Sequence, residues 1–359
     1  MIAGPRARVR LDSLRHNLAT VRRAAPGARV LAVVKANAYG HGLVPVARAL
    51  ERSDGLAVAR LGEALALRQA GVGGTVVVLE GAFSSEELDA AANHGLDLVV
   101  HAWWQIELLE AFAQRDRFRV WLKLDTGMNR LGFRGEEAAA ALERIRACPA
   151  IRDRPKLMTH LAVADETGHP GTRRQLDRFA ALVAADPQCE RSIANSAGVL
   201  AWPQAHGDWV RPGIMLYGIS PFAGQTGTEL GLEPAMTLET SVIALRELTA
   251  GETVGYGATW RAPRDCRVAI AAIGYADGYP RHLPNGSPAA IRGRIVPLAG
   301  RVSMDMIALD VTTVTGVAVG DTVELWGRGV AVEQVATAAG TIPYELVCGI
   351  SQRVAISWE

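Results

Sequence analysis

Short apolar runs alternate with amphipathic stretches over the first two thirds of the chain. Eight such runs can be counted, at residues 30–34, 55–59, 75–80, 96–101, 118–124, 156–161, 191–194 and 209–216. The last two have the weakest strand pattern. Short apolar runs bounded by turn residues are typical of strands that are buried in a parallel sheet.

Between these runs lie stretches rich in Ala, Leu, Glu and Arg, which predict helices at residues 62–70, 103–113, 136–147 and 175–185. The sequence Ser-Ser-Glu-Glu at 84–87 is a capping-box signature and predicts a further helix. Alternating strands and helices indicate a parallel sheet, and eight repeats allow it to close into a (β/α)8 barrel. An open, doubly wound sheet is the alternative, although the first strand–loop lacks a complete GxGxxG motif.

The pattern changes after Pro234. Strand-like runs follow at residues 236–248, 267–273, 289–298, 306–311, 322–325 and 347–357, with one helical stretch near 331–339. We therefore expect a barrel over residues 1–230 and a mostly β domain over residues 231–359. The polar segment 224–228 is the expected linker.

Composition narrows the class of protein. The chain has 359 residues, and its 38 basic and 37 acidic side chains give a net charge of +1. This balance does not favour nucleic acid or an anionic membrane as partner, so a small-molecule partner is expected. Four widely spaced cysteines argue against a disulfide framework and a zinc site. With no run of membrane-spanning length, we expect a cytoplasmic protein without a metal.

Polar residues gather at the predicted carboxyl ends of the barrel strands, where the chemistry of such barrels lies. They are Lys35, residues 123–130, His160, residues 195–196, Arg211 and Gly213. Each of them alone has a plain structural explanation, such as an ion pair or a hydrogen-bonded core histidine. Their shared location favours a functional site instead.

Lys35 ends the run Val-Leu-Ala-Val-Val, and the residues that follow it are loop formers. A desolvated amine at that position is prepared to form a Schiff base with an aldehyde such as pyridoxal phosphate. The alternative is a strand-end lysine that extends to solvent. This segment alone leaves both interpretations open.

Six motifs in order resemble those of alanine racemases, and the resemblance covers nearly the whole chain. They are Val-Val-Lys-Ala-Asn-Ala-Tyr-Gly-His-Gly at 33–42, Gly-Met-Asn-Arg-Leu-Gly-Phe at 127–133, Arg-Pro-Gly-Ile at 211–214, Gly-Tyr-Gly at 255–257, Gly-Tyr-Ala-Asp-Gly at 274–278 and Val-Ser-Met-Asp at 302–305. The resemblance implies a pyridoxal 5'-phosphate enzyme, built as a barrel followed by a β domain, that interconverts L-alanine and D-alanine. It would supply D-alanine for peptidoglycan or serve alanine catabolism.

The resemblance also implies roles for individual residues. Lys35 would bind the cofactor aldehyde, and Arg211 would face its pyridine nitrogen with His160 nearby. The cofactor phosphate would be held by Tyr39, Ser196, Tyr344 and the backbone amides of Gly213 and Ile214. Late barrel loops with a glycine suit an anion independently of the resemblance, although Arg-Pro-Gly alone is also a common turn.

Two bases on opposite faces of the substrate are implied, namely Lys35 and Tyr256. In this family the tyrosine reaches the barrel of the other subunit, so a homodimer with shared sites is expected. Without the resemblance, Tyr256 would be interpreted as a surface residue of a hairpin loop.

Arg130 and the amide of Met304 would bind the substrate carboxylate, and Lys123 matches a lysine that is carbamylated in many members. Further implied residues are Tyr275 and Asp305 as supporting groups and Asp165, Arg281 and Arg301 along the access path. Ser303 stands where some members have cysteine. A broad-specificity or serine racemase, a barrel decarboxylase and a non-catalytic cofactor-binding barrel remain as alternatives.

Overall fold

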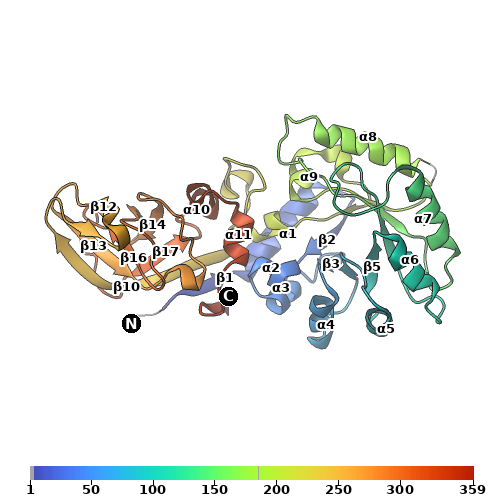
Figure 1. Cartoon of the computed structure of the whole chain (residues 1–359), viewed down its shortest axis with the longest axis horizontal. Helices are drawn as coiled ribbons and strands as arrows, with labels where there is room; N and C mark the ends of the chain where they lie inside the picture. The colour runs from blue at the N-terminus through green and yellow to red at the C-terminus, as the bar shows by residue number, and fades with distance from the viewer. Residues whose placement is uncertain (1–3, 185) are drawn as a thin grey trace.

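The first of two domains is a closed barrel of parallel strands, as the alternating pattern predicts (Figure 1). The computed structural model describes residues 4–184 and 186–359. The barrel strands are β2 (Arg29–Val33), β3 (Gly55–Val58), β4 (Val76–Val78), β5 (Asp97–Val100), β6 (Val120–Lys123), β7 (Lys156–Met158), β8 (Arg191–Ser192) and β9 (Trp209–Val210). Strands β3, β4 and β5 are buried along their whole length, which explains why they appear in the sequence as continuous apolar runs.

Helices surround this barrel. They are α1 (Leu11–Ala24), α3 (Leu43–Ala49), α4 (Leu61–Gln69), α5 (Ser85–Asn93), α6 (Trp103–Glu110), α7 (Gly135–Ala147), α8 (Gly171–Val183) and α9 (Ser196–Ala201). Five of them, α4 to α8, confirm the predicted helices. Ala185, the last residue of the predicted helix 175–185, lies outside the described residues. No helix in the described part of the chain is both long and apolar enough to cross a membrane.

Half of the capping box predicted at the start of α5 is present, because Glu87 bonds to the residue before the N-cap Ser84 and not to Ser84 itself. The Ser84 hydroxyl accepts the backbone N–H of Glu87 at 3.3 Å, and the Glu87 carboxylate accepts the N–H of Phe83 at 2.8 Å. These bonds satisfy backbone donors that have no partner inside the first helical turn.

The loop expected after Lys35 is instead a single left-handed helical turn, α2 (Lys35–Tyr39). The φ angles of its last four residues, Ala36 to Tyr39, lie between 52° and 54°. Each such residue costs roughly 1–2 kcal/mol because its Cβ approaches a carbonyl oxygen. Neighbours hold the turn in place, since the Glu63 carboxylate accepts the N–H of Ala36 at 2.6 Å and the Asn37 side chain accepts the N–H of Leu43 at 2.8 Å.

The strand predicted over 209–216 is wrong in its second half. Strand β9 ends at Val210, and the 3-10 helix η2 (Ile214–Tyr217) follows. Pro212 has no N–H for a sheet ladder, which explains why an apolar run leaves the strand conformation here.

The second domain is mostly β, as predicted. Its strands are β10 (Met236–Leu248), β11 (Thr253–Val254), β12 (Trp260–Arg261), β13 (Cys266–Ala271), β14 (Pro288–Ile291), β15 (Arg294–Pro297), β16 (Ile307–Asp310), β17 (Thr322–Trp326) and β18 (Ala355–Trp358). The run at 289–298 forms the hairpin of β14 and β15, which turns at Arg292 and Gly293 with positive φ. Helix α10 (Val332–Ala339) confirms the predicted helical stretch.

The strand predicted over 347–357 is wrong in its first part. Helix α11 (Pro343–Cys348) covers its first two residues, residues 349–354 are turn or irregular backbone, and only β18 is a strand. Pro343 at the first helical turn is a helix start signal, because its missing N–H has no intrahelical partner there. In Figure 1, α11 lies where the two domains meet.

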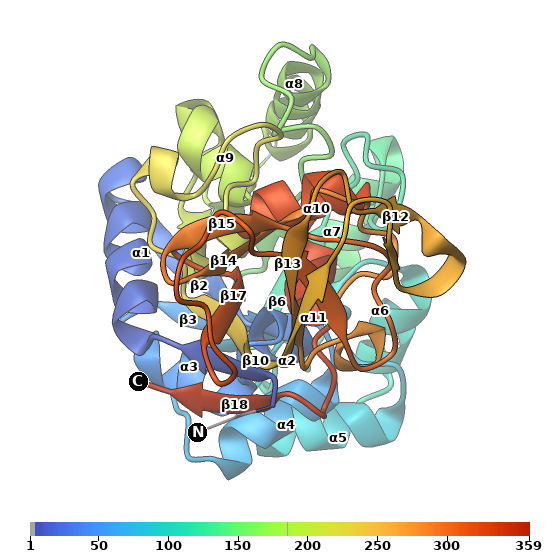
Figure 2. The same cartoon turned by 90° about the vertical axis from the view of Figure 1, so that its left-hand side faces the viewer.

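Strand β1 (Arg6–Val9) was not predicted, and it belongs to the sheet of the second domain. It pairs antiparallel with β10 and parallel with β18 (Figure 2). Arg6 and Arg8 both donate to the buried carboxylate of Glu239 on β10. The first described strand therefore belongs to the sheet of the second domain, and the chain enters the barrel after it. The domain limits 1–230 and 231–359 stay a prediction, and residues 1–3 lie outside the described residues.

Asn17 on α1 connects the barrel to the segment that enters the second domain. Its fully buried side chain donates to the carbonyls of Leu216 and Glu233 at 3.0 and 2.8 Å, and accepts the N–H of Glu233 at 2.8 Å. We predict that Asn17→Ala lowers the free energy of unfolding by roughly 3 kcal/mol or more, because backbone groups are left without partners. Urea denaturation measures this loss.

Asn93→Ala is the matched control, since Asn93 is exposed at the end of α5. Its effect should stay within about 0.5 kcal/mol. Equal stability of the two variants would show that the bonds of Asn17 do not hold the junction.

Candidate active site

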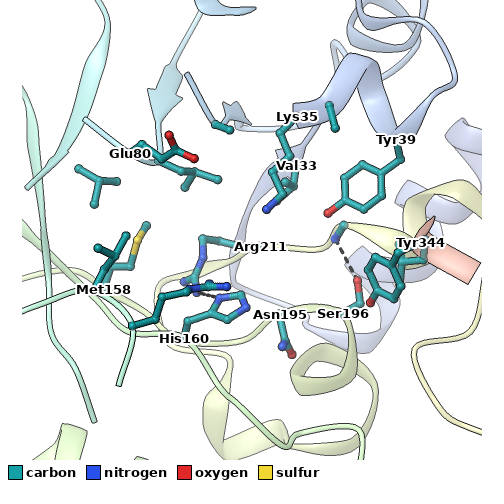
Figure 3. A pocket seen from close by; sticks show the side chains of 18 of the residues that line it. Val33, Lys35, Tyr39, Glu80, Met158, His160, Asn195, Ser196, Arg211 and Tyr344 are labelled. Carbon is teal, nitrogen blue, oxygen red and sulfur yellow. Dashed lines mark hydrogen bonds between the residues drawn. The ribbon is translucent and has the colours of Figure 1, made fainter. Parts of the chain in front are cut away.

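A cavity of about 480 Å³ opens at the carboxyl ends of the barrel strands (Figure 3). The structure brings ten of the predicted residues together there. They are Lys35, Tyr39, Lys123, Arg130, His160, Ser196, Arg211, Gly213, Ile214 and Tyr344. All but Tyr344, on α11, come from the barrel, and they follow strands β2, β6, β7, β8 and β9. The residues selected by their position at strand ends therefore share one cavity, and their roles stay a prediction.

Lys35 follows β2 and points into the cavity, as Figure 3 shows. Burial, with the nearby charge of Arg130, lowers the pKa of the Lys35 amine below its ordinary value. A lowered pKa increases the share of neutral amine, which is the nucleophilic form.

Three hydroxyls and a glycine line one side of the cavity. Tyr39 stacks on Tyr217 with ring centroids 4.7 Å apart, and the ring of Tyr344 lies 6.1 Å from that of Tyr39. Burial raises the pKa of both Tyr39 and Tyr344, so their hydroxyls stay protonated and can donate. The Ser196 hydroxyl accepts the N–H of Gly213 at 2.9 Å.

Gly213 leaves this side of the cavity open. A Cβ on Gly213 would lie 2.4 Å from the hydroxyl oxygen of Tyr39, closer than real Cβ contacts come. A glycine with hydroxyl and backbone donors around it is suited to an anion such as phosphate.

Arg211 forms the floor of the site and is 4% exposed. Its guanidinium donates to the Ser192 hydroxyl at 2.7 Å, to the carbonyls of Thr159 and Ile193 at 2.5 and 3.2 Å, and to His160 Nδ1 at 3.3 Å. Burial lowers the pKa of Arg211 to about 10, which leaves it charged at neutral pH. Four acceptors without a carboxylate fix the plane of the guanidinium.

His160 is neutral beside this cation. Burial, followed by the charges of Lys123 and Arg211, lowers the pKa of the His160 imidazole well below its ordinary value. Because a guanidinium can only donate, His160 Nδ1 accepts and the proton of the ring is on Nε2.

Lys123 is at the end of β6, and Arg130 follows in the next loop. Burial, together with the charges of Arg211 and Arg130, lowers the pKa of the Lys123 amine to about 7. The loop that carries Arg130 is held by Asp125, whose carboxylate accepts the backbone N–H groups of Gly127 and Asn129 at 3.0 Å.

Apart from Tyr344, the predicted residues of the second domain lie elsewhere in the single chain. Tyr256, Met304 and Tyr275 are 69%, 52% and 41% exposed and do not line the cavity. Asp305 pairs with Arg353 at 2.6 Å instead. Asp165, Arg281 and Arg301 are also outside the lining, and Arg301 lies next to Gly257 in the Tyr256 loop.

Sequence reasoning missed Glu80, His101 and Cys348, all of which line the cavity. The first two follow strands β4 and β5, so the strand-end rule could have found them. Cys348 is on α11, in a segment that was predicted as a strand, and no local signal marks it.

Known proteins share this arrangement. The family model of the alanine racemase N-terminal domain matches residues 9–221, and that of the alanine racemase C-terminal domain matches residues 235–358. An alanine racemase of Aeromonas hydrophila is 51% identical over 97% of each chain.

Solved structures agree over both domains. The biosynthetic alanine racemase of Pseudomonas aeruginosa superposes with a TM-score of 0.96 at 47% identity and covers all of both chains. An alanine racemase of Bartonella henselae, solved with covalently bound pyridoxal phosphate, gives a TM-score of 0.88 at 30% identity over 99% of this chain and all of that one. Two family models that together span both domains, and relatives similar from end to end, show that the chain belongs to the alanine racemase family.

Proposed function

We propose that this chain uses pyridoxal 5'-phosphate to interconvert L-alanine and D-alanine. The observation that carries the proposal is one cavity in which a lysine of lowered pKa, an anion cradle and a buried arginine meet. Membership of the alanine racemase family supports the reaction, and the covalently bound cofactor of the Bartonella henselae relative supports the cofactor.

The residues present fit this cofactor. Lys35 would hold it covalently through its neutral amine, and the phosphate would lie among Tyr39, Ser196, Tyr344 and the amides of Gly213 and Ile214. Gly213 supports this assignment, because a side chain there would collide with Tyr39. When bound, pyridoxal phosphate withdraws electrons from the amino acid and makes its α-hydrogen acidic.

Arg211 would face the ring nitrogen of the cofactor. A guanidinium keeps its proton, so Arg211 can donate a hydrogen bond to that nitrogen without protonating it. Its hydrogen bonds to Ser192, Thr159, Ile193 and His160 hold the group in place. A hydrogen bond from Arg211 without proton transfer would moderate the electron withdrawal by the cofactor. Moderate withdrawal suits an enzyme that removes a proton from one face of the substrate and returns one to the other.

Racemisation needs a base on each face of the substrate. Lys35 would serve one face and Tyr256 of the partner subunit the other. The exposure of Tyr256 and its absence from the cavity lining of its own chain support a homodimer with shared sites. Met304, Tyr275 and Asp305 lie in the same domain as Tyr256 and would enter the partner's site with it.

Arg130 would bind the substrate carboxylate, with Lys123 holding it in place. A lysine whose pKa is about 7 is largely neutral at pH 8 and can take up carbon dioxide. The carbamate formed is an anion that would pair with Arg130.

The product, D-alanine, would serve peptidoglycan synthesis. The reverse reaction would serve alanine breakdown, and both would take place in the cytoplasm.

We predict first that Lys35→Ala lowers D-alanine formation from L-alanine by at least ~10²-fold. The visible absorbance of the bound cofactor should be lost with it. The chain has three lysines, Lys35, Lys123 and Lys156, so borohydride reduction and peptide mapping of the wild type should mark one site at Lys35.

Lys156→Ala is the matched control, because Lys156 begins β7 at the opposite end of the barrel, 5.1 Å above the Trp121 ring. It should keep full activity. A reduced cofactor found on Lys123 in the wild type would refute the assignment of Lys35.

Our second prediction concerns Tyr256. Tyr256→Phe should reduce turnover by at least ~10²-fold while cofactor binding survives, because a positioned acid–base group is lost. When this variant is refolded together with Lys35→Ala, mixed dimers contain one site with both bases. Activity should recover to about a quarter of the wild type, since half the dimers are mixed and half their sites are intact.

A second mixture is the control. Wild type refolded with the double variant Lys35→Ala/Tyr256→Phe should keep about a quarter of its activity if sites are shared, and about half if each subunit has its own site. Half activity here, with no recovery in the first mixture, would contradict the shared site.

The third prediction concerns Lys123. Incubation with ¹³C-bicarbonate at pH 8 should give a carbamate carbon signal in ¹³C NMR that is missing in Lys123→Met. Because the pKa of Lys123 is about 7, the signal should fade as pH drops through 7 and the amine is protonated. Loss of the anion beside Arg130 should raise KM for alanine about tenfold, the equivalent of ~1.4 kcal/mol.

Lys156→Met controls for labelling of ordinary lysines. A carbamate signal that persists in Lys123→Met, or a wild-type signal insensitive to pH between 8 and 6, would exclude Lys123 as the modified residue.

A further inference from the structure

A second, much smaller cavity lies between the barrel and the β domain. Its volume is about 10 Å³, which is close to the space that one water molecule needs. His41 and Tyr217 line it from the barrel side, and Trp326, Val332 and Glu333 line it from the second domain. It does not share a lining residue with the candidate active site.

Two of its lining residues carry buried nitrogens without a protein partner. In the part of the chain that the structure describes, His41 Nε2 and Trp326 Nε1 make no hydrogen bond, although the residues are 0% and 1% exposed. A buried polar atom without a partner is destabilising, because it has lost its hydrogen bond to water and gained none in exchange. Such atoms are rare in folded proteins, and two of them on one small cavity indicate a common partner.

The proton on His41 can be assigned from its other hydrogen bond. His41 Nδ1 lies 2.8 Å from the carbonyl oxygen of Tyr39, and a carbonyl oxygen can only accept. Nδ1 therefore carries the proton. Burial lowers the pKa of His41 to about 4, so at neutral pH the ring is neutral and Nε2 is a bare acceptor.

Trp326 needs a hydrogen-bond acceptor, whereas His41 Nε2 needs a donor. It ends strand β17, and its indole N–H can only donate. A group between Trp326 and His41 must therefore accept one hydrogen bond and donate another. Water does both, and no smaller molecule in the cell does. Glu333 also lines the cavity, and its Oε1 already accepts the N–H groups of Ser220 and Gly227 at 2.9 and 2.8 Å.

We propose that one buried water molecule binds here, accepting from Trp326 Nε1–H and donating to His41 Nε2. This water joins β17 of the second domain to the segment that follows the left-handed turn of the barrel. His41 also contacts the turn itself, because its Nδ1–H donates to the Tyr39 carbonyl and its ring lies 4.6 Å from that of Tyr217, on which Tyr39 stacks. The proposal does not depend on the reaction proposed above.

A crystal structure of the holoenzyme at a resolution that shows ordered water provides the direct test. We expect one density peak within hydrogen-bond distance of both nitrogens. In NMR, the Trp326 indole proton should show a cross-peak to a long-lived water, identified among the eight tryptophans by its loss in Trp326→Phe. A cavity without density, or a direct Trp326–His41 hydrogen bond, would overturn the proposal.

A double-mutant cycle tests the link energetically. The losses of unfolding free energy for His41→Phe and Trp326→Phe should not add, because either change removes the same bridge. Trp202→Phe is the matched control, since Trp202 Nε1 donates directly to the Ala164 carbonyl at 2.9 Å within the barrel. Its loss should add to that of His41→Phe. Additive losses in both cycles would contradict a shared water, and the crystal structure decides the matter if His41→Phe does not fold.

Discussion

The left-handed turn between β2 and α3 is the constraint on which the site depends. It reverses the chain within four residues, so that Lys35 and Tyr39 both face the cavity. Four strained residues need compensation, and helix α11 supplies part of it by packing against the turn. The approach is so close that a Cβ on Gly40 would lie 2.0 Å from the Val347 carbonyl oxygen. Helix α11, which packs against the turn, also carries Tyr344 and Cys348. The same helix therefore supports the turn and completes the cavity.

Burial of positive charge determines the chemistry of this cavity. Lys35, Lys123, Arg130 and Arg211 all line it, and among the described lining residues Glu80 is the sole carboxylate, paired with Arg60 at 3.4 Å. Desolvation is the largest cause of the lowered pKa at Lys35, Lys123 and Arg211. Burial of positive charge has two consequences in this cavity. The lysines lose protons more readily, and the arginines stay charged and attract anions. The phosphate, substrate carboxylate and carbamate proposed above would each neutralise part of this positive charge.

The sequence predicted the barrel and the strand-end residues because both follow from local patterns. Apolar runs mark buried parallel strands, and position at a strand end marks Lys35, His160 and Arg211 without any further knowledge. Features that depend on contacts between residues far apart in the sequence were not predicted. Strand β1 alternates arginines with apolar residues over four positions, and its partner Glu239 is more than 200 residues away. The left-handed turn depends on a helix near the carboxyl end of the chain, which no local pattern around Lys35 reveals.

The local sequence around Tyr256 does not indicate its role, and only the family resemblance identified this residue. In the single chain the side chains of Tyr256, Tyr275 and Met304 are all exposed. The barrel mouth likewise exposes Phe83, Trp104 and Leu131. Exposed apolar groups gathered beside a cavity are costly unless another surface covers them. The homodimer proposed above would place the exposed groups of one second domain over the mouth of the partner's barrel, and each apolar surface would then cover the other.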